Sequence, residues 1–350
     1  MAETPRLRVQ ALSQIGISHV PPQFIQQPEN RPVPPIKSLS TIDIPVIDLA
    51  GIDSDRSDEI RNEIGRVCEE WGAFQVINHG VPVRLLDDMR NVGLTFFHDL
   101  PMEEKLKYAC DTSAAATEGY GTRMLAGAGD DAVLDWRDYF DHHTFPLSRR
   151  NPSRWPHFPP QYREVVAEYA DQMKLLAHKL LASISQSLGL VASSIEHAVG
   201  EIYQNITLSY YPPCPQPELT LGLQAHSDFG AITLLTQDDV EGLQVLKDGN
   251  WIIVKPLSHA IIVLLSDQTE IMTNGKYRSA IHRAIANSSK ARLSVATFHD
   301  PAKPKIISPI ADLISESCPP RYRAVLYSDY VSSWYTKGPE GKRNIDSLLL

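Results

Sequence analysis

The chain has 350 residues, of which 43% are hydrophobic and 21% are charged, and its formal net charge at pH 7 is −9. This length and composition are typical of a globular protein with one large core or two lobes. The acidic balance argues against nucleic acid or an anionic membrane as the main partner, and no stretch reaches the roughly 18 consecutive apolar residues of a membrane span.

The cysteines and the N-terminus indicate the compartment. Four cysteines are widely scattered, which predicts free thiols in a reducing environment: Cys68, Cys110, Cys214 and Cys318. Residues 1–10 lack the apolar run of a secretory signal. We therefore expect a cytoplasmic protein, with a nuclear share left open, and a monomer that binds neither nucleic acid nor a membrane.

The N-terminal half predicts an arm followed by mixed helices and strands. Residues 1–41 are rich in proline and predict an extended arm with a short helix near 7–16. In residues 42–200, apolar spacing predicts helices over 55–71, 82–100, 101–108, 160–188 and 191–199, and strands over 44–49, 73–77 and 136–145. Residues 112–134 are rich in Ala, Gly, Thr and Asp and predict a loop or irregular strand that could act as a pocket lid.

The C-terminal half predicts a β-rich core. In residues 201–302, strand patterns dominate at intervals typical of an all-β barrel or jelly roll. Residues 303–350 form an extension with an expected helix over 321–335. The fold class is therefore α+β, with a helical N-terminal region packed against the β core.

A His-x-Asp pair and a distant histidine suggest a metal site. His226 and Asp228 stand at i and i+2, so on a strand both side chains project from one face. His282 follows a turn signal at Asn274-Gly275, where a hairpin would return the chain to the metal. Two imidazoles and one carboxylate on one face of an ion form the usual ligand set of non-haem Fe(II) oxygenases.

An Arg-x-Ser pair lies ten residues beyond the last of these side chains. Arg292 and Ser294 are again i and i+2 in a β-prone run, so both should face one cavity. A fixed cation beside a hydroxyl suits the far carboxylate of 2-oxoglutarate. A catalytic zinc site is the competing interpretation, since zinc also accepts two histidines and a carboxylate. The Arg-x-Ser pair favours iron, because a hydrolase does not need a second carboxylate anchor.

These motifs occur in an order that resembles a known family, the plant 2-oxoglutarate- and Fe(II)-dependent dioxygenases related to anthocyanidin synthase and flavonol synthase. The resemblance covers roughly residues 40–340. It includes the runs IPVIDL at 44–49, WGAFQVINHG at 71–80, YYPPCP at 210–215, NGKYRS at 274–279 and HR at 282–283, together with the two pairs described above. The family fold is a double-stranded β-helix, a jelly roll, with an N-terminal helical region.

The resemblance implies roles for individual residues. It makes His226, Asp228 and His282 the iron ligands, and it assigns the far carboxylate of 2-oxoglutarate to Arg292, Ser294 and Tyr211. Substrate-pocket positions fall on Tyr139, Phe140, Asp141, Phe298 and Asp300, where the two acids would bind a hydroxyl or a basic nitrogen or would only be solvated. His79 belongs to a stretch that the family uses structurally.

The chain departs from the family pattern near the site. Ser209 is expected among the residues that bind the co-substrate, but it stands where relatives often have an asparagine, so a hydrogen bond toward 2-oxoglutarate would be shortened or lost. Ser258-His259 replaces Pro-Gly, and Ser266 replaces the glycine of a later turn, where a positive φ would strain a residue other than glycine. His259 belongs to a surface turn in this interpretation and is not an extra ligand.

The expected function is oxidation of a small plant specialised metabolite with Fe(II), 2-oxoglutarate and O2. The substrate would be a flavonoid, coumarin or terpenoid, and the reaction hydroxylation, with desaturation or O-demethylation as alternatives. Ascorbate is expected to stimulate turnover. An ascorbate-dependent oxidase of the ethylene-forming type and a non-catalytic small-molecule-binding jelly roll remain as competing functions.

Overall fold

The computed structural model describes residues 8–32, 42–110, 118–122, 133–337 and 344–350. Most of the segment expected to form a pocket lid therefore lies outside the described residues. The pieces of it that are described include a short strand, β3 (Gly119–Gly121). All four cysteines are free thiols, as predicted.

The larger of two facing sheets contains strands from both halves of the chain. Its eight described strands run in the order β1 (Val46–Asp48), β2 (Ala73–Ile77), β10 (Ile261–Leu265), β7 (Ile232–Gln237), β12 (Arg292–Asp300), β5 (Tyr203–Tyr211), β4 (Asp138–Phe145) and β3. β1 is an edge strand that pairs in parallel with β2, while the other pairs are antiparallel. The N-terminal region thus shares its sheet with the C-terminal core.

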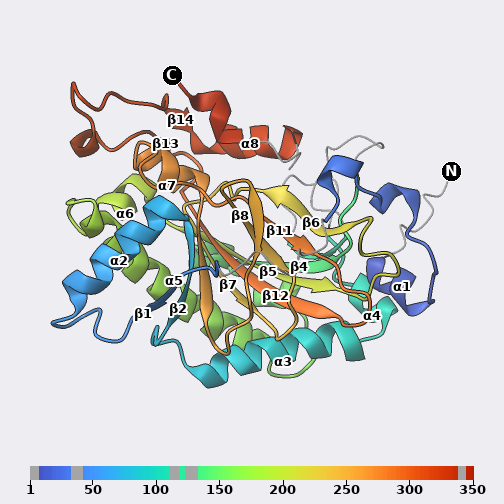
Figure 1. Ribbon diagram of the computed structural model, residues 1–350. Helices are drawn as coiled ribbons and strands as arrows, with labels where there is room; N and C mark the ends of the chain where they lie inside the picture. The colour runs from blue at the N-terminus through green and yellow to red at the C-terminus, as the bar shows by residue number, and fades with distance from the viewer. Residues whose placement is uncertain (1–7, 33–41, 111–117, 123–132, 338–343) are drawn as a thin grey trace.

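The smaller sheet lies across from the middle of the larger one (Figure 1). It contains four described strands in the order β6 (Leu221–His226), β11 (His282–Ile285), β8 (Leu243–Lys247) and β9 (Asn250–Ile253). An apolar cluster between the sheets includes Leu243 and Val245 from the smaller sheet and Ile262 and Leu264 from the larger. Two largely antiparallel sheets packed in this way form the predicted jelly roll.

Helices cover the outer face of the larger sheet. The described helices before the jelly roll are α1 (Val9–Gln14), α2 (Ser57–Glu70), α3 (Val83–Asp99), α4 (Met102–Leu106), α5 (Tyr162–Ser187) and α6 (Ser194–Val199). α3 and α5 pack against the outer face, and α3 runs along the bottom of the view in Figure 1. The apolar positions that predicted these helices are buried, including Ile64 of α2, Met89 of α3 and Met173 of α5.

Strand β10 shows why the fold needs both layers. Its side chains alternate between two cores: Ile261, Val263 and Leu265 face the helices, whereas Ile262 and Leu264 face the smaller sheet. A continuous apolar run is the pattern of a strand covered on both faces. Burying such a side chain on either face contributes about 1.5–3 kcal/mol to folding.

Two expectations for the C-terminal third are wrong. The chain before Asn274 is a short helix, α7 (Asp267–Met272), and not the first strand of a hairpin. The C-terminal helix α8 (Tyr327–Lys337) starts six residues later than expected, because residues 325 and 326 form a strand, β14, paired with β13 (Ile306–Ile307). Elements this short carry no measurable periodicity, so apolar spacing cannot detect them.

The buried acids of α7 explain how so polar a helix can lie inside the protein. Glu270 accepts hydrogen bonds from the backbone N–H of Ser279 and the hydroxyl of Tyr322, at 2.7 and 2.6 Å. Asp267 accepts one at 2.6 Å from the hydroxyl of Tyr330 in α8. The C-terminal extension is therefore attached to the core by hydrogen bonds to buried carboxylates.

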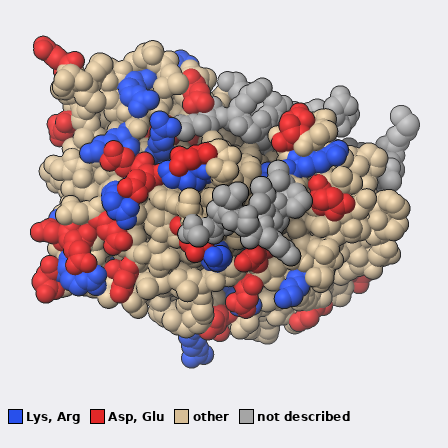
Figure 2. Space-filling view, viewed as in Figure 1, with Lys and Arg blue, Asp and Glu red and all other residues tan. Residues whose placement is uncertain are grey.

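Two features of the structure concern the expectation that the protein binds neither a membrane nor nucleic acid. Among the described residues, no helix combines the length and the apolar character needed to cross a bilayer. On the face seen in Figure 2, Lys and Arg side chains lie scattered among acidic ones.

Candidate active site

The two histidines and the aspartate come together at one end of the smaller sheet. His226 is the last residue of β6 and lies directly opposite His282, the first residue of β11. Asp228 stands two residues beyond the end of β6, in the loop that leads to β7. The i, i+2 argument therefore named the right residues, although the strand itself ends at His226.

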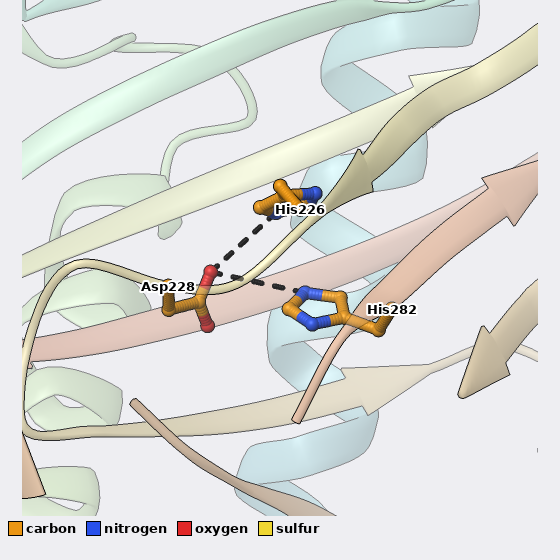
Figure 3. A group of neighbouring side chains, drawn as sticks. All are labelled: His226, Asp228 and His282. Atoms are coloured by element: carbon orange, nitrogen blue, oxygen red, sulfur yellow. Dashed lines mark ion pairs between the residues drawn. The ribbon is translucent and has the colours of Figure 1, made fainter. Parts of the chain in front are cut away.

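The geometry of the three side chains suits a metal ion. One ligand atom from each residue can be chosen so that all lie within 4.8 Å of one another. The Nε2 atoms of His226 and His282 lie 3.5 and 3.7 Å from the same Asp228 oxygen, Oδ1 (Figure 3). All three side chains are nearly buried, so an ion held there is shielded from bulk water.

Backbone carbonyls fix the tautomer of both imidazoles. Nδ1–H of His226 donates to the carbonyl of Gln224 at 2.8 Å, and Nδ1–H of His282 donates to that of Ala280 at 3.0 Å. Each Nε2 therefore keeps its lone pair and points toward Asp228, which is the usual orientation for metal-binding histidines.

The electrostatics keep the ligands in their metal-binding protonation states. Burial raises the pKa of the Asp228 carboxyl, but His282, His226 and a hydrogen bond from Thr233 outweigh it and lower this pKa to about 2. Burial and the nearby His226 lower the pKa of His282 to about 4. Near pH 7 the aspartate is ionised and His282 is neutral. Two imidazole nitrogens and one carboxylate oxygen fit Fe(II) and leave room for further ligands.

Arg292 lies on the larger sheet, on the face turned toward the smaller one. It pairs with Tyr211 across β12 and β5, and its guanidinium carbon is 5.1 Å from the centre of the tyrosine ring. Nη2–H donates to Gln237 Oε1 at 2.9 Å, whereas the buried Nε has no hydrogen-bond partner among the described residues. A buried donor without a partner is costly, which fits a site that binds an anion.

Two glycines make room for this pair. A Cβ atom at Gly242 would lie 2.7 Å from Cδ of Arg292, and one at Gly222 would lie 2.6 Å from the ring of Tyr211. Both neighbours would have to move to admit a larger residue. The smaller sheet is thus shaped to let the guanidinium and the phenol lie against it.

The next row of the larger sheet contains three predicted site residues side by side. Ser294 of β12 lies opposite Ser209 of β5, which in turn lies opposite Tyr139 of β4. Ser209 accepts a hydrogen bond at 2.9 Å from Nη1 of Arg137, a buried arginine that the sequence did not single out. The serine that stands at the family's asparagine position is thus hydrogen-bonded to a guanidinium.

The structure divides the expected substrate-pocket residues. Asp141 lies on the same face of β4 as Tyr139, and Phe298 lies on the same face of β12 as Ser294. Phe140 does not join them, because successive strand residues point to opposite faces and its ring packs in the helix-facing core, 5.3 Å from that of Phe96. Its assignment to the pocket is therefore wrong.

Of the two expected pocket acids, Asp300 is buried and Asp141 is partly buried. Burial raises the pKa of Asp141 to about 6, although a hydrogen bond from Thr207 opposes the shift. Burial and the nearby Asp228 raise the pKa of Asp300 to about 7. Asp300 lies against the loop after β6, where a Cβ at Gly230 would come within 2.1 Å of its Oδ1.

Several residues near the site were missed. Thr233 donates to Asp228 Oδ2 at 2.6 Å, and Thr233 and Gln237 are the second and last residues of β7. The β7 sequence ITLLTQ does not alternate between polar and apolar residues, so its pattern did not single out either residue. Trp334 of α8 likewise left no signal in the sequence. Its ring lies 5.0 Å from that of Phe229 and 6.4 Å from that of His226. The C-terminal helix therefore covers the metal-ligand cluster.

The other departures from the family pattern have local outcomes. His259 adopts a φ of 58°, in the left-handed region that favours glycine, and lies on an exposed turn. Ser266 has a φ of −112°, so glycine's freedom is not needed there. His79 is structural: its Nδ1 accepts from the N–H of Val81 and its Nε2–H donates to the carbonyl of His259.

Comparisons with known proteins agree with this geometry. Residues 202–301 match the 2OG-Fe(II) oxygenase superfamily, and residues 44–161 match the N-terminal region described as non-haem dioxygenase in morphine synthesis. Jasmonate-induced oxygenase 4 of Arabidopsis thaliana is 40% identical over 351 residues, which cover 99% of this chain and 98% of that protein. The chain belongs to the 2-oxoglutarate- and Fe(II)-dependent dioxygenases.

Relatives with other activities are also similar. A naringenin,2-oxoglutarate 3-dioxygenase of Callistephus chinensis is 43% identical over 82% of this chain and 80% of its own length. The crystal structure of JOX2 in complex with 2OG, Fe and JA is 39% identical, covers 99% of this chain and 98% of its own, and has a TM-score of 0.90. This dioxygenase therefore uses Fe(II) and 2-oxoglutarate, as the sequence predicted.

Proposed function

We propose that this dioxygenase hydroxylates a small plant specialised metabolite held between the two sheets. The observation that carries the proposal is the arrangement of the larger sheet's inner face. Arg292 and Tyr211 lie in one of its rows, and Thr233, which holds Asp228, lies opposite Phe298 in another. In this proposal 2-oxoglutarate is bound at one end of this inner face and the metal is held near the other end. The neighbouring strands β5 and β4 are then available to contact the substrate.

Each group of residues has a distinct task in this proposal. His226, Asp228 and His282 bind Fe(II), which supplies the redox chemistry for activating O2 and decarboxylating 2-oxoglutarate to succinate and CO2. Arg292 and Ser294, assisted by the hydroxyl of Tyr211, bind the far carboxylate of 2-oxoglutarate. A charge-assisted hydrogen bond of this kind contributes about 1.5–3 kcal/mol.

The substrate lies against the strands that carry Tyr139, Asp141 and Phe298. Asp141 accepts a hydrogen bond from a substrate hydroxyl or basic nitrogen, and Phe298 supplies apolar contact. Asp300 shapes the metal end of this region. Trp334 of α8 excludes water from the metal ligands by covering His226.

The similarity to jasmonate-induced oxygenases over nearly the whole chain supports jasmonic acid (JA) as the first compound to test. The flavanone and flavonol relatives support a flavonoid as the second, and coumarins and terpenoids follow. A thebaine 6-O-demethylase of Papaver somniferum, 38% identical over 98% of this chain and 95% of its own length, makes O-demethylation the second reaction to score.

The test is turnover by the purified protein with Fe(II), 2-oxoglutarate, ascorbate and O2. Succinate is quantified together with products that gain one oxygen atom or lose a methyl group. Substrate-dependent succinate supports the proposal, whereas turnover of ascorbate without succinate indicates the ethylene-forming type. The His226→Ala and Asp228→Ala variants should bind no Fe(II) and make no product, and full activity in either variant contradicts the ligand assignment.

We further propose that the protein acts as a cytoplasmic monomer without nucleic-acid or membrane partners. The acidic net charge of −9 and the free cysteines support this. Light scattering of the purified protein and fluorescence imaging of a tagged copy test the two statements separately.

A further inference from the structure

Arg137 occupies a seam between the two sheets. It precedes β4, in a segment that is bonded to the smaller sheet: the N–H of Trp136 donates to the carbonyl of Leu221 in β6 at 2.8 Å. The arginine side chain is only 2% exposed. It therefore lies between β6, the strand that ends at His226, and the face of the larger sheet that carries Arg292.

The contacts of Arg137 place its guanidinium on that inner face. Nη1–H donates to Ser209 Oγ at 2.9 Å, and the guanidinium carbon is 5.5 Å from the centre of the Tyr139 ring. Ser209 lies opposite Ser294, the neighbour of Arg292 on the same strand face. Because adjacent strands are about 4.8 Å apart, the backbones that carry the two arginines are about 10 Å apart, with β5, the strand of Ser209, between them.

The charges around Arg137 favour a role beyond packing. Asp135 and Asp141 are partly buried acids, and burial raises the pKa of both while Arg137 opposes the shift. A dicarboxylate that enters a site flanked by these two acids meets like charges. A second cation beside Arg292 offsets that repulsion, and a planar guanidinium can bind a carboxylate through two parallel hydrogen bonds.

We propose that Arg137 is a second carboxylate anchor of the active site. Its ligand is a carboxylate lying beside Ser209, either the C1 carboxylate of 2-oxoglutarate or the carboxylate of an acidic substrate. Arg292 and Arg137 then bind different carboxylates from opposite sides of β5. Ser209, at the position where this chain differs from the family pattern, orients the Arg137 guanidinium.

The first arm of the test measures 2-oxoglutarate binding without turnover. Titration calorimetry of 2-oxoglutarate into the Mn(II)-loaded full-length protein, with O2 excluded, compares wild type with Arg137→Gln. If Arg137 binds the C1 carboxylate, the Kd rises about tenfold or more. The loss should appear again in an Arg292→Gln background, because two anchors on separate carboxylates contribute independently.

A matched control separates this role from general packing. Arg150 also stacks on an aromatic ring, with its guanidinium carbon 4.5 Å from the centre of Phe145, and donates to the carbonyl of Thr144. It lies away from the metal-ligand cluster, so Arg150→Gln should leave the Kd of 2-oxoglutarate within twofold of wild type. If Arg137→Gln does not fold, Arg137→Lys keeps the charge and should raise the Kd about threefold.

The second arm tests the substrate carboxylate and rests on the proposed function. Binding of jasmonic acid and of its methyl ester is measured in the protein loaded with Mn(II) and 2-oxoglutarate. A loss of acid affinity of tenfold or more in Arg137→Gln, with the ester unchanged, assigns the substrate carboxylate to Arg137. If the Kd of 2-oxoglutarate stays within twofold of wild type and the variant keeps the wild-type preference for the acid over the ester, the proposal is wrong. If wild type binds neither compound, the proposed substrate is wrong and the first arm alone decides the role of Arg137.

Discussion

Arg292 and Tyr211 face each other across β12 and β5, with the guanidinium carbon 5.1 Å from the centre of the ring. Gln237 holds one end of the guanidinium, and Gly242 lets its aliphatic stem pack closely against the smaller sheet. The guanidinium of Arg292 is therefore held in one orientation before any ligand binds. A pre-organised cation of this kind binds a carboxylate with little further loss of side-chain entropy.

Replacing Arg292 should weaken 2-oxoglutarate binding selectively. In Arg292→Gln, the KM for 2-oxoglutarate should rise about 10- to 100-fold, because one or two charge-assisted hydrogen bonds are lost. The KM for the organic substrate should change less than about threefold, since this proposal places the substrate on β5 and β4. Steady-state kinetics with each compound varied in turn measures the split, and equal increases in both constants contradict the anchor role.

Thr233 should contribute to metal affinity although it is not itself a ligand. Its hydroxyl donates to Asp228 Oδ2 at 2.6 Å and leaves Oδ1 turned toward the two imidazoles. Thr233→Val should lower Fe(II) affinity about 10- to 100-fold, the usual cost of losing a partner that orients a ligand. Thr236→Val is the control, because that hydroxyl on the same strand contacts Tyr169 instead. Equal metal affinities in the two variants, measured by competition with a chelating dye, would exclude the orienting role.

Asp141 should make the stability of the apo protein depend on pH. Its pKa is raised to about 6 by burial, from an ordinary value of 3.8, so the folded state binds this proton more tightly than the unfolded state does. The unfolding free energy should therefore fall as pH rises from about 4 to 6 and stay reduced above 6. Because the carboxyl is half-buried, the cost above pH 6 is on the order of 1–3 kcal/mol.

The Asp141→Asn variant isolates this contribution. It should be more stable than wild type at pH 7.5, and the difference should vanish only well below pH 3.8, near pH 2.5, where the aspartate is protonated in both states. Urea unfolding of both proteins at the two pH values measures the change. A stability difference that stays constant over this range shows that the carboxyl titrates normally.

Long periodic segments were predictable from sequence because their burial is repeated many times. The helix α5 was recognised from apolar residues on one face over its whole length, and β2 was predicted with its bounds unchanged. The jelly roll and the residues of the metal-ligand cluster followed from motif order. These features depend on local patterns that tertiary contacts reinforce.

The features that sequence could not give depend on which distant segments meet. Phe140 looked like a pocket residue because its neighbours are, and only the pairing of β4 with β5 shows which face it occupies. Arg137 is placed at the site by its hydrogen bond to Ser209, which is 72 residues away in the sequence. Trp334 covers His226 because Tyr330 holds α8 to the buried Asp267. None of these contacts leaves a periodic trace in the chain.

His259 should be a site where glycine stabilises the protein. Its φ of 58° costs a residue with a Cβ about 1–2 kcal/mol. Its imidazole contact with Asp87, at 3.1 Å between partly exposed groups, contributes about 0–1 kcal/mol. The bond from His79 reaches the backbone carbonyl of residue 259 and survives any substitution there.

His259→Gly should therefore raise the unfolding free energy by about 0.5–1 kcal/mol, whereas His259→Ala keeps the strain, loses the contact and should be no more stable than wild type. Thermal and urea unfolding of the three proteins decide the matter, and a glycine variant less stable than the alanine variant would show that the turn is not strained.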